Sequence, residues 1–243
     1  HHSLNELGNP VSQSLESLQG SLRQMLTWFL SPKSLGLEHD GEHAVHMVAN
    51  HLAEGYAGLD HGLPAELPEE IEIKPFDKSE YQATDRDYLA PVVELGDWAN
   101  REVAEHTIDF MIHGSLATMD YSRGWSDFDT FLIITKQTAT DGRALTDLRT
   151  KLLGAYEYLT QIDPLQHHGF LVCTELDLRR YNQGIMPLVV LQNAKSYFGQ
   201  QSHRINPFTN PADDRKTLDS RTKFFRDAAE TGVMKHRPYE NVF

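Results

Sequence analysis

The feature that most constrains this chain is a stretch in which two strand-like apolar runs flank a Gly-Ser pair and two closely spaced aspartates. The runs, 108–113 and 129–135, are short and rich in β-branched or aromatic residues, which is typical of buried strands. Gly114 and Ser115 follow the first run, and the aspartate pair opens the second. The stretch therefore predicts a nucleotide and metal site built on two central strands.

The aspartates, Asp127 and Asp129, have the chemistry of a metal site. Because side chains alternate along a strand, both are expected to project to one face, with Phe128 on the other. Two carboxylates so close repel each other unless a cation lies between them, and oxygen ligands suit Mg²⁺ (or Mn²⁺), whose coordination substrate phosphates complete. Gly114 lets the backbone approach a phosphate, and Ser115 offers a hydroxyl where a helix is expected to begin.

These residues resemble the signature of the DNA polymerase β-like nucleotidyltransferase superfamily, in its minimal or aminoglycoside-type form. That signature has a hydrophobic residue, then Gly-Ser, a spacer, and Asp-hydrophobic-Asp. The resemblance implies that Gly114 and Ser115 hold the triphosphate of a nucleotide, and that Asp127 and Asp129 are catalytic residues that bind two divalent metal ions. Ser126 matches the commoner Ser-Asp-hydrophobic-Asp form and joins the nucleotide-binding residues.

One position departs from this pattern. Minimal nucleotidyltransferases often have an arginine three residues after the serine, where this chain has Thr118. Arg123 is nearby and is the candidate for the phosphate contact instead. A simpler interpretation is that a Gly-Ser pair and an Asp-x-Asp coincide by chance and that the aspartates are only solvated. The joint agreement of spacing, flanking strands and residue types favours a site.

The third catalytic group has three interpretations. The apolar run 169–178 is predicted to be the third strand, and the corresponding strand of the superfamily carries a carboxylate that binds a metal or acts as general base. Glu175 and Asp177 share one face of the expected strand and are the carboxylate candidates. His167 and His168, at its beginning, could instead act as base near neutral pH or mark a lost metal ligand. In the third interpretation, no group there has a chemical role.

Helices are expected on both sides of the strands. Apolar residues at helical spacing predict a helical pair in 1–62, a helix directly after Pro91, and another over 143–161. The predicted fold class is therefore α/β (α+β), with a small mixed β-sheet as the core. The nucleotidyltransferase core is assigned to 63–200 and a C-terminal helical segment to 201–243, which lacks a clear stop signal and leaves open whether the native chain continues.

Two other patterns have ordinary structural explanations. His39, His43 and His46 recur at helical spacing, with His51 further along the same segment. No cysteine or glutamate motif completes a metal site, so we assign these histidines to a solvated helix face. The segment 193–199 predicts a short strand that ends in an aromatic residue and glycine. We expect Tyr197 to be packed and Lys195 to be solvated rather than to contact nucleotide.

Composition excludes several classes of protein. The 243 residues are 40% hydrophobic, enough for a sizeable core, and no run is long enough to span a membrane. No signal peptide is visible, and the single cysteine excludes an intrachain disulfide framework, so a reducing cytoplasm is expected. The 22 basic and 35 acidic residues give a net charge of −13, which disfavours a nucleic-acid partner. A small-molecule or protein acceptor is expected instead.

The resemblance implies transfer of a nucleoside monophosphate, by default AMP from ATP, to an acceptor hydroxyl with release of pyrophosphate and a two-metal mechanism. Two other interpretations stay open. One is a catalytically retired fold that binds nucleotide as a regulatory module. The other is the nucleotidyltransferase half of a toxin and antitoxin system, which modifies a protein partner.

Overall fold

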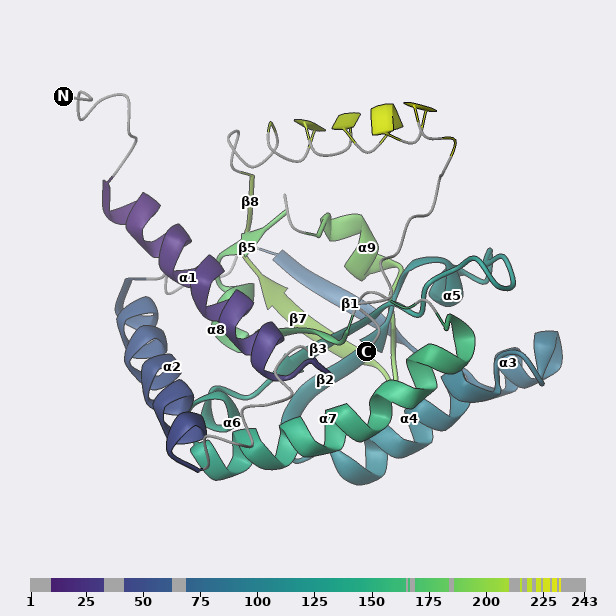
Figure 1. The fold of residues 1–243 in the computed structure, drawn as a ribbon, viewed down its shortest axis with the longest axis horizontal. Helices are drawn as coiled ribbons and strands as arrows, with labels where there is room; N and C mark the ends of the chain where they lie inside the picture. The colour runs from purple at the N-terminus through teal and green to yellow at the C-terminus, as the bar shows by residue number, and fades with distance from the viewer. Residues whose placement is uncertain are drawn as a thin grey trace.

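The predicted strands meet in one mixed sheet in the computed structural model of the chain (Figure 1). The structure describes residues 10–32, 42–62, 69–164, 166, 169–183 and 186–209, and scattered positions between 215 and 232. Within these residues, a six-stranded sheet has the order β4-β3-β2-β6-β1-β7, and β5 and β8 form a second sheet. The strands are β1 (Glu69–Pro75), β2 (Thr107–Ile112), β3 (Thr130–Ile134), β4 (Leu171–Thr174), β5 (Tyr181–Asn182), β6 (Lys195–Ser196), β7 (Gln201–Ile205) and β8 (Pro207–Phe208).

The pairing of the central strands determines which strand ends lie together. Strand β2 is antiparallel to β3, and β3 is parallel to β4. The C-terminal end of β2 therefore meets the N-terminal end of β3, where the aspartate pair begins. On its other side β2 pairs with β6, which has only two residues and also pairs with β1. Strand β7 pairs with β1 in antiparallel orientation and forms the edge of the sheet.

Helices surround this sheet, which confirms the predicted mixed α/β class. They are α1 (Pro10–Phe29), α2 (Glu42–Gly62), α3 (Lys78–Asp85), α4 (Ala90–Glu102), α5 (Gly114–Thr118), α6 (Lys136–Thr140), α7 (Gly142–Ile162), α8 (Glu175–Leu178) and α9 (Leu188–Gln192). The expected N-terminal pair is α1 and α2, and the two other expected helices are α4 and α7. No helix in the described part of the chain is long and apolar enough to cross a membrane.

The long helix α7 shows why these residues form a helix. Asp141 caps its N-terminus, because its carboxylate accepts hydrogen bonds from the backbone N–H groups of Arg143 and Ala144, both at 2.9 Å. Such a cap typically contributes about 1 kcal/mol. The apolar residues then recur at helical spacing and are buried against the sheet: Leu145, Leu148, Leu152, Ala155, Leu159 and Ile162.

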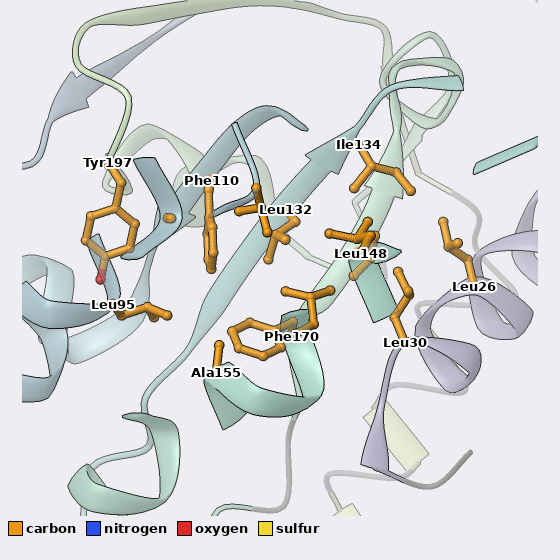
Figure 2. Packing of buried hydrophobic residues seen from close by; sticks show 14 of the residues in the cluster. Leu26, Leu30, Leu95, Phe110, Leu132, Ile134, Leu148, Ala155, Phe170 and Tyr197 are labelled. Atoms are coloured by element: carbon orange, nitrogen blue, oxygen red, sulfur yellow. The ribbon is translucent and has the colours of Figure 1, made fainter. Parts of the chain in front are cut away.

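The main core lies between one face of the sheet and helices α1, α2, α4 and α7. Figure 2 shows side chains from the sheet together with Leu26 of α1, Leu95 of α4 and Leu148 of α7 in this core. Phe110 of β2 is fully buried, with edge-to-face contacts to the rings of Phe170 at 5.8 Å and Tyr197 at 5.6 Å between centroids. Burying one such ring stabilises the fold by roughly 1.5–3 kcal/mol. Strand β2 is therefore held firmly on the face that meets the main core.

A second hydrophobic cluster lies on the opposite face of the sheet. Its members include Met111, Ile133 and Leu178.

Two predicted elements differ from the structure. The strand predicted over 169–178 is wrong in its second half, because β4 ends at Thr174 and α8 follows at once. Residues 201–205, which we expected to begin a helical segment, form strand β7.

Candidate nucleotide and metal site

The turn after β2 brings Gly114 against Asp129. Gly114 has φ of +67°, in the left-handed region that residues with a Cβ adopt only at a cost. A Cβ built on it would lie 2.8 Å from Oδ2 of Asp129. The backbone N–H of His113 donates to the carbonyl of Asp129 at 3.1 Å, which holds the two segments together. Glycine is therefore required by both the backbone conformation and the neighbouring carboxylate.

The two aspartates flank a core residue directly before β3. Phe128 is 0% exposed and packs in the main core, whereas Asp127 and Asp129 are both half-buried. This difference in burial agrees with the expectation that Phe128 lies on the other face from the two aspartates, although β3 itself begins only at Thr130. A buried aromatic ring between the carboxylates anchors this extended segment. The aspartates themselves remain accessible from solvent.

Gln166 fixes the backbone between the two aspartates. Its side chain is fully buried, its Oε1 accepts from the N–H of Phe128 at 3.2 Å, and its Nε2 lies 3.3 Å from the Phe128 carbonyl. The amide makes the pair of bonds that a neighbouring strand would otherwise make. Sequence reasoning missed this residue, because a glutamine in a loop carries no local signal of its partner. His167 and His168, which follow it, lie outside the described residues.

The loop between α5 and β3 carries two more of the predicted nucleotide-binding residues. The Oγ of Ser126 accepts from the backbone N–H of Ser122 at 2.9 Å, so this hydroxyl stabilises the loop. Ser115, which precedes this loop and was also predicted to bind nucleotide, is half-buried in the five-residue helix α5, next to Gly114. Its neighbour Thr118 is exposed, with its hydroxyl directed to the helix backbone and Asp120.

Arg123 is already paired with a carboxylate. Its Nε lies 2.6 Å from Oδ2 of Asp85, a second guanidinium nitrogen also contacts this carboxylate, and the guanidinium stacks 5.2 Å from the centre of the Tyr88 ring. The hydrogen bonds from Arg123 lower the pKa of Asp85. A phosphate would have to compete with Asp85 for this arginine, so it is a weaker phosphate ligand than the sequence suggested.

Glu175 and Asp177 do not join the aspartate pair. Phe131 pairs with Leu171 and Ile134 with Thr174, in parallel orientation. Asp129 lies before the start of β3 and Glu175 after the end of β4, so the length of the strands, roughly 20 Å, separates the two carboxylates. Both residues lie in helix α8, so the expectation that they share one face of a strand is wrong.

Asp177 has a structural role in α8. Asp177 is 2% exposed, and its carboxylate accepts from the backbone N–H of Thr174 at 2.8 Å and from the Thr174 hydroxyl at 3.2 Å. The Thr174 side chain in turn accepts from the backbone N–H of Asp177, which completes a capping box. Burial raises the pKa of this carboxyl. The pattern Thr174-x-x-Asp177 is a signal for a helix start that was available in the sequence.

A separate acidic group at the far end of the sheet is an ion-pair network. Glu105, His106 and Asp147 place one possible ligand atom each within 4.8 Å of one another. Lys151 reaches into the group, with Nζ 3.2 Å from Glu105 and 2.7 Å from Asp147. Its ammonium supplies the positive charge that a metal ion would otherwise bring.

The remaining expectations concern ordinary packing. Tyr197 is buried and its hydroxyl donates to the Val92 carbonyl at 3.0 Å, which confirms a packed aromatic residue. Lys195 forms an ion pair with Glu80 at 2.7 Å instead of lying free in solvent. Of the histidines on α2, His46 and His51 are exposed, as a solvated helix face predicts, whereas His39 lies outside the described residues.

Comparisons of the chain with known protein families, with curated proteins and with solved structures found no match in any of the three. The superfamily resemblance therefore stays a prediction that rests on the residues described above.

Proposed function

We propose that this protein is a metal-dependent nucleotidyltransferase, which transfers a nucleoside monophosphate from a triphosphate, by default ATP, to an acceptor hydroxyl and releases pyrophosphate. One observation carries the proposal: Gly114, in a left-handed conformation, lies against the carboxylate of Asp129. The two halves of the signature are separated by a loop in the sequence but are neighbours in space. The antiparallel pairing of β2 with β3 holds the two halves together.

The residues present fit a divalent cation. Asp127 and Asp129 would hold Mg²⁺ or Mn²⁺, because both are partly exposed oxygen donors on a segment that Phe128 and Gln166 anchor. When bound, the metal would neutralise the negative charge that develops during in-line displacement at the α-phosphorus. Because Gly114 has no side chain, its backbone can approach a phosphate closely.

The location of the predicted third carboxylates favours a second candidate function. Glu175 and Asp177 lie in α8, after the end of β4, whereas Asp129 lies before the start of β3, which runs parallel to β4. Two carboxylates still suit nucleotide binding with a metal, but neither Glu175 nor Asp177 supplies the general base that the superfamily resemblance implies. The second candidate is therefore a regulatory module that binds nucleotide without transferring it.

The first experiment is a calorimetric titration of ATP, GTP, CTP and UTP into the protein with Mg²⁺ and again with EDTA. We expect one nucleotide to bind only with metal, and an Asp127→Asn, Asp129→Asn double variant to lose that binding. Glu94→Gln, an exposed carboxylate on α4, is the matched control and should bind as the native chain does. Absence of binding to all four nucleotides in Mg²⁺ would remove the proposal.

A second experiment separates transfer from binding. The protein is incubated with a nucleotide labelled at the α-phosphate, together with lysate of the native host, and label and pyrophosphate are followed. Label on a protein supports a protein acceptor, as in a toxin and antitoxin pair, and label on a small molecule supports a small acceptor. Metal-dependent binding without release of pyrophosphate in any mixture supports the regulatory module.

A further inference from the structure

A cleft lies at the opposite end of the central strands from Asp129. It has a volume of about 470 Å³ and is lined by residues of α2, α6, α8, β2 and β7. Figure 1 shows α8 at the left of the view and α5 at the right. Ile108, near the start of β2, lies in its wall, whereas Gly114 follows the end of that strand. The length of β2 separates the two places by roughly 20 Å. The volume falls in the range of small-molecule sites, about 300–1,000 Å³.

The charge of the lining is opposite to that of the whole chain. The chain has a net charge of −13, yet the cleft brings together Lys136, Arg179 and Arg204 against two carboxylates, Asp60 and Glu175. The three cationic residues come from separate parts of the chain, because Lys136 lies in α6, Arg179 directly follows α8, and Arg204 lies in β7. Convergence of positive charge on a cleft in an acidic protein is the arrangement that an anionic ligand requires.

One carboxylate is shared between two of the cations. Nζ of Lys136 lies 3.1 Å from Oδ2 of Asp60, and the guanidinium of Arg179 contacts Oδ1 of the same residue. These contacts, the hydrogen bond from Lys136 first, lower the pKa of Asp60. Asp60 therefore orients both cations but neutralises only one positive charge.

Arg204 supplies a further donor. Its position on β7 is exposed, and no hydrogen bond or ion pair joins its guanidinium to any other residue that the structure describes. A guanidinium presents a planar fork of N–H groups that matches two oxygens of one phosphate. Arg204 can therefore meet an incoming anion without first breaking an ion pair.

A buried histidine completes the wall. His203 is 7% exposed, and its Nε2 lies 2.6 Å from Oδ2 of Asp109, which is 0% exposed. Asp109 also accepts from the hydroxyl of Ser196, so the carboxylate that orients the imidazole is itself fixed. With Nε2 engaged by Asp109, Nδ1 is the ring nitrogen left for a ligand. Such a preorganised polar group is typical of a binding site rather than of a solvated surface.

We propose that this cleft binds a small phosphate monoester, with Arg204, Arg179 and Lys136 as the phosphate ligands. A phosphate monoester presents three strong acceptor oxygens, so three cationic side chains can each contact it, whereas a carboxylate presents only two. Leucine side chains of α8 also line the cleft and provide an apolar surface for the organic part of the ligand. The proposal is independent of the nucleotidyltransferase reaction, because the cleft shares no residue with the aspartate site.

Methyl phosphate is the probe, titrated by calorimetry into the full chain in EDTA. We expect millimolar or tighter binding, which Arg204→Gln weakens by about tenfold, the loss that corresponds to one charge-assisted contact. Arg101→Gln, an exposed arginine on α4, is the matched control and should bind as the native chain does. Asp60→Asn should tighten binding, because it releases Lys136 and Arg179 from a competing carboxylate. A misfolded variant would not gain affinity, so this result cannot come from a loss of folding.

Three results would overturn the proposal. The first is no binding of methyl phosphate to the native chain, and the second is an equal effect of Arg204→Gln and Arg101→Gln. The third is equal binding of acetate, which would make the cleft a carboxylate site. The Asp127→Asn, Asp129→Asn variant separates the two proposals, because it should lose nucleotide binding with Mg²⁺ and keep methyl phosphate binding in EDTA.

Discussion

Replacing Gly114 with alanine adds one methyl group at the point where β2 meets Asp129. The left-handed backbone conformation costs a residue with a Cβ about 1–2 kcal/mol. The new Cβ would also lie 2.8 Å from Oδ2 of Asp129, closer than real Cβ contacts allow. Because the obstructing atom is the end of a side chain, the carboxylate can move at little further cost in stability. Its displacement is what should weaken metal and nucleotide binding.

Gly124→Ala is the matched control. Gly124 has φ of +71°, so alanine there meets the same backbone cost, but nothing lies within 4 Å of the position that its methyl group would take. Both variants should lose about 1–2 kcal/mol of unfolding free energy in urea titrations. Only Gly114→Ala should weaken Mg²⁺-dependent ATP binding, by about tenfold or more, in calorimetric titrations.

Two outcomes would refute this reasoning. If Gly114→Ala binds ATP as tightly as Gly124→Ala, then Asp129 does not need the space that glycine leaves. If Gly114→Ala loses several kcal/mol more stability than Gly124→Ala, then the methyl group displaces backbone, and any loss of binding follows from a wider rearrangement.

Two further changes test the neighbourhood of the site and the cap of α8. Gln166→Leu should lower the free energy of unfolding by about 1–3 kcal/mol for each polar group of Phe128 left without a partner, and weaken Mg²⁺-dependent ATP binding; a urea titration with no loss would show that the amide is dispensable. Burial raises the folded-state pKa of Asp177, so the folded chain holds the proton more tightly than the unfolded chain, and stability should fall as pH rises from about 4 through the folded pKa. Asp177→Asn should flatten that dependence in urea titrations across the same pH interval, and parallel curves for the two proteins would contradict the assignment.

The elements that could be predicted are those whose pattern is local. The runs 108–113 and 129–135 gave β2 and β3 nearly at their observed bounds, because buried strands of this kind need only a continuous apolar segment. The run Glu-Leu-Asp-Leu at 175–178 alternates like a strand, yet the capping box from Thr174 to Asp177 turns it into a helix.

Other features depend on partners distant in the sequence. Strand β7 has little hydrophobic patterning and forms because β1 offers it a full antiparallel edge. The hydrogen bonds of Gln166 to Phe128 join a residue that follows α7 in the sequence to one that precedes it, so no short window of sequence contains both. The cleft gathers Lys136, Arg179 and Arg204 from separate parts of the chain, and each alone looks like an ordinary surface residue.

The two-residue strand β6 divides the large sheet into unequal parts. On one side, β2, β3 and β4 carry the main core and the aspartate pair, and on the other, β1 and β7 carry His203 and Arg204. Because β6 is so short, few backbone hydrogen bonds join the two parts of the sheet. The buried hydrogen bond between His203 and Asp109 adds a contact between them. A phosphate held by both Arg179 and Arg204 would connect the same two parts at the surface. Ligand binding in the cleft and the association of the two parts of the sheet would then be thermodynamically linked.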